Sequence, residues 1–141
     1  EFNQLTYWMN RQIIDDYPLE LVSPVDWTDD SQNINDRVRS YLDVNCGHCH
    51  SPTGNANSTG LYLHLDETRD IHLGLYKKPV ATGRGSGGLK YSIVPGKPDE
   101  SILLHRMISL DPGVMMPESG RALSHTEAVE MVREWILVME D

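Results

Sequence analysis

The segment Asn45-Cys46-Gly47-His48-Cys49-His50 contains both cysteines of this 141-residue chain. Two cysteines three positions apart cannot form the disulfide framework of a small secreted protein. Their spacing places two thiols about one helical turn apart, where both can add to the vinyl groups of one porphyrin. The histidine that follows would then lie under the iron as its proximal ligand. This interpretation predicts Cys46 and Cys49 as attachment points of one covalent haem c, with His50 as a metal ligand.

Three other interpretations of the cysteine segment remain open at this point. Cys-Gly-His-Cys is also a dithiol redox motif, but the thioredoxin fold needs a strand before the motif and a helix after it. Here a helical pattern precedes the motif and a loop follows it. Zinc could be bound by the two thiols with His64 and His72, although these histidines stand farther apart than the usual spacing of about three to five intervening residues. The last alternative is a pair of buried thiols without a cofactor.

Hydrophobic periodicity predicts an all-α fold around this segment. Apolar residues recur at helical spacing in four segments, over residues 4–14, 31–46, 98–109 and 124–139. Ser31 and Ser124 are the predicted N-terminal caps of two of them. The helix before Cys46 is expected to pack against the last helix, whose apolar stripe is wide. Residues 51–97 contain eight of the 11 glycines and are predicted as a long irregular segment.

Length and charge exclude several classes of protein. A single haem domain is expected over residues 31–141, preceded by an arm or linker over 1–30. Lys and Arg number 12 against 21 Asp and Glu, a net charge of −9, so no basic footprint for nucleic acid is present. No apolar run approaches the roughly 18 residues of a membrane span. No signal peptide is visible, and because the chain starts without Met we expect it to be a piece of a longer protein.

Charge is unevenly distributed along the chain. The net charge is −6 over residues 1–45, +3 over 46–97 and −6 over 98–141. We expect Arg84, Lys90 or Lys97 of the basic middle segment to pair with haem propionates. Arg84 is preferred because its flanking glycines permit close approach. We further expect the acidic remainder of the surface to steer a partner that carries a basic patch.

A second axial ligand is predicted in the segment Gly113-Val114-Met115-Met116-Pro117. A thioether on a short, proline-stiffened loop can hold a weak iron–sulfur bond, and His/Met ligation closes the iron to substrates. Adjacent methionines cannot both point at one iron, so Met116, beside Pro117, is the predicted ligand and Met115 is the alternative. Both could instead fill gaps in the core. The rival sixth ligands are His64, His72, His105 and His125.

The apolar content is slightly low for a folded domain of this size. Hydrophobic residues make up 39% of the chain, with one Phe. Counting Gly and leaving out Tyr, as in the usual tally, gives about 43% against roughly 45–50%. We therefore expect a small core that is partly filled by a cofactor.

These motifs together resemble a class I c-type cytochrome over residues 31–141. The resemblance rests on Cys46-Gly47-His48-Cys49-His50, on Met116-Pro117 and on the two terminal helices. More narrowly, residues 39–45, 93–103 and 134–136 resemble cytochrome modules of larger exported bacterial proteins, some of which accompany carbohydrate-binding domains. The chain departs from the family in its long 51–97 segment. It also lacks a proline about ten residues after His50 that would offer its carbonyl to the imidazole.

The resemblance implies a class I cytochrome c-like helical fold around one covalent haem, and one-electron transfer rather than enzymatic catalysis. It implies a monomer with a redox protein as its partner, for which a copper polysaccharide monooxygenase is one candidate. Attachment through this motif implies maturation outside the cytoplasm, so a periplasmic or secreted location is expected. Peroxidase-like catalysis or ligand sensing, which need an open sixth position, and thiol–disulfide exchange are the alternative functions.

Overall fold

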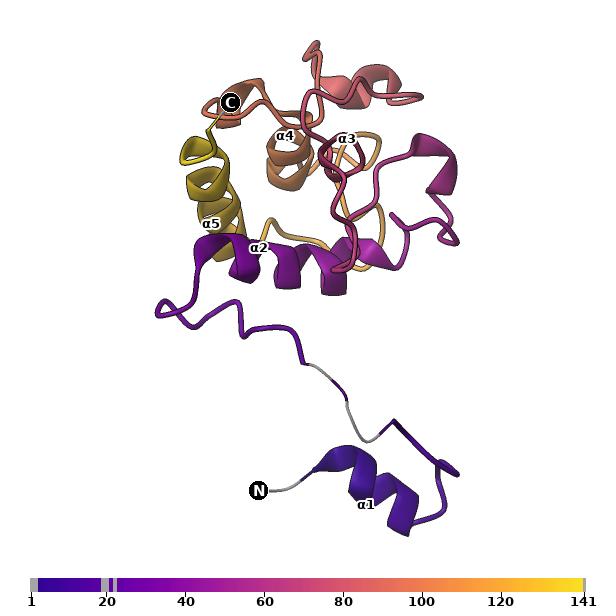
Figure 1. Ribbon diagram of the computed structural model, residues 1–141. Helices are drawn as coiled ribbons and strands as arrows, with labels where there is room; N and C mark the ends of the chain where they lie inside the picture. The colour runs from indigo at the N-terminus through magenta and orange to yellow at the C-terminus, as the bar shows by residue number, and fades with distance from the viewer. Residues whose placement is uncertain (1–2, 19–20, 22, 141) are drawn as a thin grey trace.

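The structure is a computed structural model that describes residues 3–18, 21 and 23–140. These residues form helices and irregular segments (Figure 1). No strand occurs among them, and extended pairing is limited to two isolated bridges, between Leu75 and Ile93 and between Tyr91 and Ser101. The expectation of an all-α fold is confirmed for this part of the chain.

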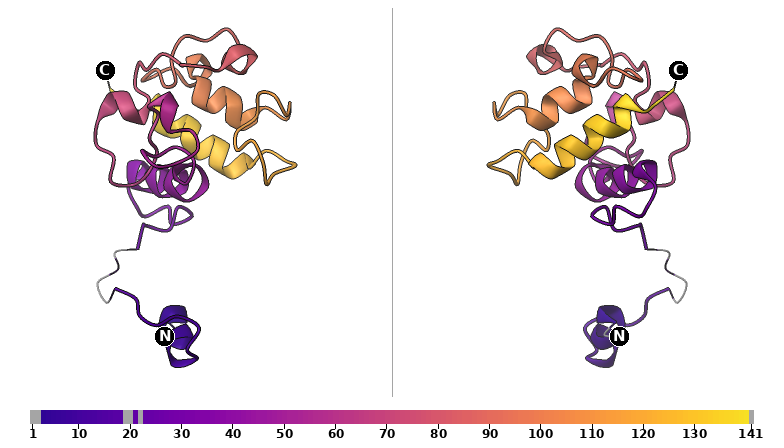
Figure 2. Two further views of the ribbon diagram at one scale, coloured as in Figure 1. Left: turned by 90° about the vertical axis from the view of Figure 1, so that its right-hand side faces the viewer. Right: turned by 90° about the vertical axis from the view of Figure 1, so that its left-hand side faces the viewer.

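Five α-helices and several shorter turns make up the described chain. The α-helices are α1 (Gln4–Asn10), α2 (Ile34–Leu42), α3 (Asp70–Leu73), α4 (Ile102–Ile108) and α5 (Thr126–Leu137). A π-helical segment, Asp43–Gly47, follows α2 directly, and 3-10 turns occur at Asn57–Thr59, Gly83–Ser86 and Pro98–Glu100. In Figure 1, α2 lies along the lower edge of the body, α5 at its left and α4 between them, and the irregular middle of the chain lies above and to the right; Figure 2 shows the same body from two further sides.

The core lies where α2 and α4 pack against α5. Val38 and Leu42 of α2 are fully buried there, as are Val132 and Ile136 of α5. Each such side chain contributes about 1.5–3 kcal/mol through burial of apolar surface. The predicted packing of the helix before Cys46 against the last helix is therefore confirmed.

The predicted cap of α2 is wrong by two residues. The helix begins after Asn33, whose side-chain oxygen accepts the amide of Asn35 at 2.8 Å. Ser31 instead donates its hydroxyl to the Asp29 carboxylate at 2.7 Å. That Asp-centred turn stabilises the approach to the helix rather than its first turn.

The predicted cap of α5 at Ser124 is also wrong. The N-cap residue is His125, and its side chain makes no capping hydrogen bond. Ser124 donates its hydroxyl to the carbonyl of Met107 at 3.3 Å. The serine thus caps the end of α4 rather than the start of α5, because the two helix ends meet there.

The N-terminal residues divide into two parts. Helix α1 lies apart from the body in Figures 1 and 2, and it ends earlier than the predicted residue 14. The chain turns soon after the helix, at Gln12, whose φ is 56°. By contrast, Trp27 is partly buried against the core, and its carbonyl accepts from Arg37 Nε at 2.8 Å. The residues packed on the body therefore begin before residue 31.

The middle of the chain is irregular, as predicted, and backbone hydrogen bonds fix its course. The amide of Leu63 donates to the carbonyl of His50 at 2.8 Å, which anchors this segment on the cysteine motif. Farther along, the amide of Ile93 donates to the carbonyl of Gly74 at 2.9 Å. Residues 51–97 thus wrap the body through local turns and a few long-range bonds, without regular elements longer than α3.

Candidate functional site

The cysteine motif is delivered by a continuous helical path. Helix α2 passes into the π-helical segment Asp43–Gly47, which contains Cys46. The side-chain amide of Asn45 donates to the Tyr41 carbonyl at 2.8 Å and so satisfies an acceptor in the widened turn. Single π-helical turns inside α-helices occur frequently at functional sites, because they re-aim the side chains that follow.

One further turn brings the remaining motif side chains together. The amides of Cys49 and His50 both donate to the carbonyl of Cys46, at 3.1 and 2.8 Å. Gly54 closes the loop on this turn so tightly that a Cβ there would lie 2.1 Å from the Cys49 carbonyl oxygen. Any residue other than glycine at position 54 would displace the backbone of Cys49. The site therefore requires glycine there.

Cys46, Cys49, His50 and Met116 all line one cavity of about 940 Å³. The first three come from the turn after α2, whereas Met116 comes from the loop between α4 and α5. The cavity therefore has two thiols and an imidazole from one segment and a thioether from another. Its apolar walls include Leu61, Leu63, Ile102, Leu103 and Met107.

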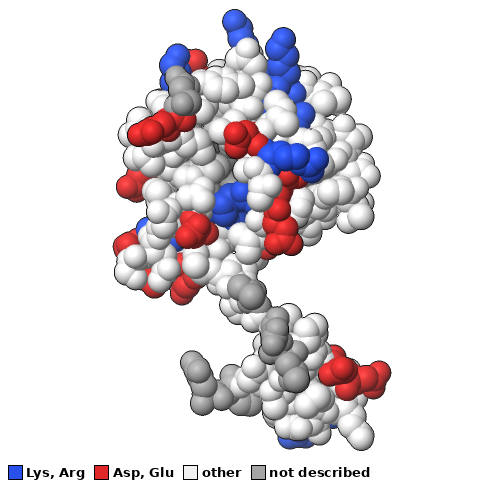
Figure 3. Space-filling model, in the orientation of Figure 1, with Lys and Arg blue, Asp and Glu red and all other residues white. Residues whose placement is uncertain are grey.

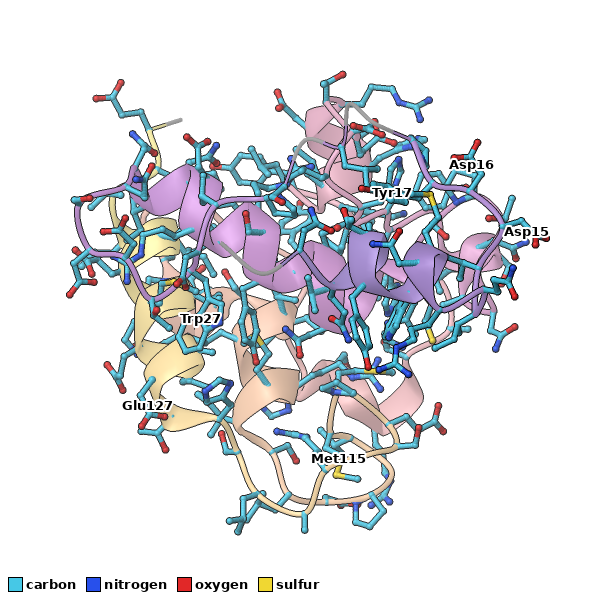
Figure 4. The ribbon with its side chains drawn as sticks, turned by 90° about the horizontal axis from the view of Figure 1, so that it is seen from below. Asp15, Asp16, Tyr17, Trp27, Met115 and Glu127 are labelled. Carbon is cyan, nitrogen blue, oxygen red and sulfur yellow. The ribbon has the colours of Figure 1, made fainter. Side chains whose placement is uncertain are left out.

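The loop that carries Met116 is fixed by backbone contacts with α4. The Met116 amide donates to the Arg106 carbonyl at 2.9 Å, and Arg106 Nε donates to the Val114 carbonyl at 2.8 Å. Arg121 returns from the far side of the loop and donates to the Met107 carbonyl at 2.7 Å. Met115, which lies on the same loop in Figure 4, is not among the residues that line the cavity. The loop therefore presents Met116, and not its neighbour, to the cavity.

The imidazole of His50 is held in an environment that favours its neutral form. Burial lowers the pKa of His50, the nearby Arg106 cation lowers it further, and the Leu61 backbone partly offsets the shift as a hydrogen-bond acceptor. Its Nδ1 is buried and forms no hydrogen bond with the described part of the chain. A neutral imidazole is the form that binds a metal ion.

Burial raises the pKa of the Cys46 thiol to about 12, and the neighbouring Cys49 adds to this shift. Both cysteines are free thiols in the structure. The thiolate is the reactive species in disulfide exchange, and redox-active cysteines have lowered pKa values. The environment of Cys46 is thus the opposite of that in a dithiol oxidoreductase.

Arg84, the preferred partner for a propionate, lies outside the residues that line the cavity. Its guanidinium forms two hydrogen bonds with the Asp111 carboxylate, at 2.9 and 3.0 Å, and its side chain is 70% exposed. Lys97 lies 3.4 Å from Glu100 and does not line the cavity either, nor does Lys90.

The cations that do line the cavity are Lys77 and Arg106. Burial lowers the pKa of Arg106, with Glu118 opposing the shift. The sequence contained a signal for this residue, because Arg106 falls on the apolar face of the helix over 98–109. A cation on such a face needs a polar partner, and the Val114 carbonyl occupies only its Nε.

Arg39 of α2 is a buried cation. Its Nη2 donates to the carbonyls of His64, Leu65 and Glu67, at 2.8, 2.9 and 2.9 Å. Asp43, one turn later, accepts the Leu65 amide at 2.9 Å. Together the two side chains attach the 64–67 loop to α2 and so fix the wall that carries Leu61 and Leu63. The sequence did not indicate this role, because the carbonyls that Arg39 binds lie far from it along the chain.

None of the rival sixth ligands His64, His72, His105 and His125 is among the described residues that line the cavity. His72 Nδ1 lies 3.2 Å from Glu67, and His125 Nδ1 is hydrogen-bonded to the Tyr41 hydroxyl at 3.1 Å. Within residues 3–18, 21 and 23–140, no group of three or more His, Cys, Asp or Glu side chains is arranged to hold a metal ion. The zinc interpretation with His64 and His72 therefore has no geometric support.

Comparisons with protein-family models, with curated proteins and with solved structures give no match for this chain. Among the described helices, none has both the length and the apolar character that crossing a membrane requires.

Proposed function

We propose that this protein is a monohaem c-type cytochrome that transfers single electrons. Cys46 and Cys49 would each add a thiol across a vinyl group of the porphyrin, and His50 and Met116 would be the axial ligands. The observation that carries the proposal is that these four side chains, from two separate segments, line the same cavity. When bound, haem supplies a one-electron iron couple.

The residues present fit that group in size and in chemistry. A volume of about 940 Å³ lies within the roughly 300–1,000 Å³ range of ligand and cofactor sites. The apolar lining of the cavity matches the hydrophobic surface of a porphyrin. The lowered pKa of His50 keeps its imidazole neutral and so available as a ligand. The raised pKa of Cys46 argues against the thiol–disulfide alternative.

Arg106 and Lys77 replace Arg84 in the proposal as the cations that hold the propionates. Both line the cavity, and the guanidinium of Arg106 is partly desolvated, which strengthens its interaction with an anion. Arg84 is instead committed to Asp111 at 2.9 Å. On this assignment Arg84 stabilises the loop between α4 and α5 by binding the Asp111 carboxylate at the start of that loop.

The finer fold assignment is part of the same proposal. A helix that leads into the cysteine motif and a last helix packed against it are the arrangement expected of a class I cytochrome c-like domain, here over residues 31–141. Val44 and Val80, which line the cavity and are 68% and 64% exposed, would surround its solvent-facing edge. We further propose a monomer, a periplasmic or secreted location and a redox partner such as a copper polysaccharide monooxygenase.

A denaturing gel stained for haem tests the attachment. The protein, expressed in cells able to mature c-type cytochromes, should keep a coloured band through denaturation. Cys46→Ala with Cys49→Ala should lose that band, whereas Arg84→Gln should keep it. An unstained wild-type band from such cells would overturn the proposal. Ready binding of carbon monoxide by the reduced wild-type protein would instead favour catalysis or ligand sensing, which need an open sixth position.

A further inference from the structure

A second hollow, of about 580 Å³, lies between the segment before α2 and the outer face of α5. Its apolar part is formed by Trp27, Met131 and Leu137. Leu137 is 59% exposed, so this hollow is an open groove rather than an internal cavity. Figure 4 shows Trp27 beside α2 and Glu127 at the start of α5, on the same flank of the body. We refer to this hollow as the α5 groove.

The charges of the α5 groove are predominantly negative once its ion pairs are counted. Arg37 is paired with Asp30 at 2.6 Å, and Arg133 is paired with Asp99 at 2.7 Å. Three carboxylates of α5 line the groove, those of Glu127, Glu130 and Glu134, and of these Glu127 lies 3.8 Å from His125 Nε2. In Figure 3, Asp and Glu occur along the side of the body on which α5 lies and also in its centre, and Lys and Arg occur at the upper edge and in the centre.

A cluster of packed aromatic rings extends from the α5 groove into the core cluster against which Cys46 packs. The ring of Trp27 lies 5.1 Å from that of His125 and 5.5 Å from that of Tyr41, both edge to face. Tyr41 is 7% exposed, and Cys46 packs against the core cluster to which Tyr41 belongs. The rings therefore fill the space between the α5 groove and the core cluster on which the cysteine motif packs.

We propose that the α5 groove is the docking site of a basic redox partner. The partner would present a segment in which lysine or arginine side chains surround one apolar side chain. The apolar side chain would fill the space over Trp27 and Met131, and the cations would face Glu127, Glu130 and Glu134. The redox role of this surface rests on the proposed function, whereas the binding itself does not.

The other opening of the body does not fit such a partner. The cavity that contains the cysteine motif is lined by Lys77 and Arg106, with Glu118 as its only carboxylate among the described residues. On the proposed function the two propionates pair with these two cations, so this opening offers a basic segment no row of carboxylates like that of the α5 groove. Charge therefore separates the two surfaces and assigns the basic partner to the α5 groove.

Tris(phenanthroline)chromium(III) tests this docking surface without the natural partner. It is a trivalent cation with flat apolar ligands, and its paramagnetism broadens nuclear resonances close to where it binds. Added to the reduced protein, it should first broaden the Trp27 indole and Met131 methyl signals. The Val80 signal at the cavity should broaden only at higher concentrations.

Matched variants separate the groove from overall charge. The triple variant Glu127→Gln, Glu130→Gln, Glu134→Gln should weaken probe binding on the order of tenfold. The triple variant Asp15→Asn, Asp16→Asn, Asp66→Asn changes the net charge equally at exposed sites outside the groove and should leave binding within about twofold.

Three results would overturn the docking surface. One is that the cavity signal of Val80 broadens at a lower probe concentration than the signals of the groove. Another is that both triple variants lose probe affinity equally. The third is a dimer in solution that the glutamine variant dissociates, which would assign the groove to a second copy. The probe reports binding alone. A folded protein without covalent haem would therefore contradict the proposed function, while its broadening pattern would still test the groove.

Discussion

The amide of His50 donates to the carbonyl of Cys46 at 2.8 Å, so one helical turn holds the first thiol and the imidazole on the same wall of the cavity. Met116 lies in the loop on another side of that cavity and is tied to the Arg106 carbonyl. The site therefore depends on the packing of α4 against α5, which positions this loop, as much as on the motif itself.

Replacing the two methionines separately tests the distal ligand. Met116→Ala should retain covalent haem but lose the low-spin His/Met spectrum, because the sixth position is opened. The reduced variant should then bind carbon monoxide. Met115→Ala is the matched control, since Met115 does not line the cavity, and it should keep the wild-type spectrum. Loss of the His/Met spectrum in Met115→Ala alone would make the assignment wrong.

Arg39→Met should lower the free energy of unfolding by about 3 kcal/mol or more. The substitution leaves the carbonyls of His64, Leu65 and Glu67 without their shared donor. Denaturant titration followed by circular dichroism measures the change. Arg133→Gln removes an exposed ion pair with Asp99 and should cost less than about 1 kcal/mol. Equal effects of the two substitutions would contradict the role given to Arg39.

Glu67 should make stability depend on acid pH. Its hydrogen bonds with Arg69 are the main reason that its pKa lies far below the ordinary value of 4.5. A lowered folded-state pKa contributes stability that is present above the unfolded-state pKa and is lost as the pH falls below it. The difference in unfolding free energy between wild type and Glu67→Gln should therefore be largest above about pH 5 and shrink steadily below pH 4.5. A pH-independent difference would show that the carboxylate's charge plays no part.

Much of the fold could be predicted from the sequence, and the errors have a common physical cause. Helical periodicity located α2, α4 and α5 because each presents an apolar face to one core. The predicted caps at Ser31 and Ser124 failed because both serines found tertiary or local partners that the sequence does not reveal. Which residue caps a helix depends on the groups that meet in the folded protein, whereas the helix itself follows from the apolar pattern of its own residues.

The candidate site shows the same division. The cysteine motif and Met116 are sequence patterns with their own chemical logic, and the structure places them around one cavity. The cation partner depends on three-dimensional placement, and here the prediction favoured Arg84, whereas Arg106 and Lys77 line the cavity. Glycine neighbours made close approach of Arg84 possible but did not determine its direction, which the Asp111 carboxylate sets.

The chain without haem should fold poorly. Without haem, the cavity of about 940 Å³ would leave its apolar walls exposed to water or to empty space. Cys46→Ala with Cys49→Ala, expressed without haem attachment, should show weak near-ultraviolet circular dichroism and no cooperative thermal transition. A sharp transition like that of the haem-loaded protein would contradict this expectation and would show that the helices alone stabilise the core.

Electron transfer to a cationic oxidant should slow as salt is added. The net charge of −9 attracts tris(phenanthroline)cobalt(III), and salt screens that attraction over about 10 Å at 0.1 M. Stopped-flow rates measured from low to high ionic strength should fall for this oxidant and rise for anionic ferricyanide. A rate with the cobalt complex that does not fall would exclude steering by the acidic surface.

The absorption spectrum of the oxidised and reduced wild-type protein tests the central claim most directly. A covalent haem with His50 and Met116 as ligands predicts sharp, separate α and β bands on reduction and, on oxidation, the weak long-wavelength band of iron–methionine coordination. A reduced spectrum of an open, high-spin haem would contradict the axial pair. A protein matured in cells able to attach haem that shows no haem absorption would contradict the account as a whole.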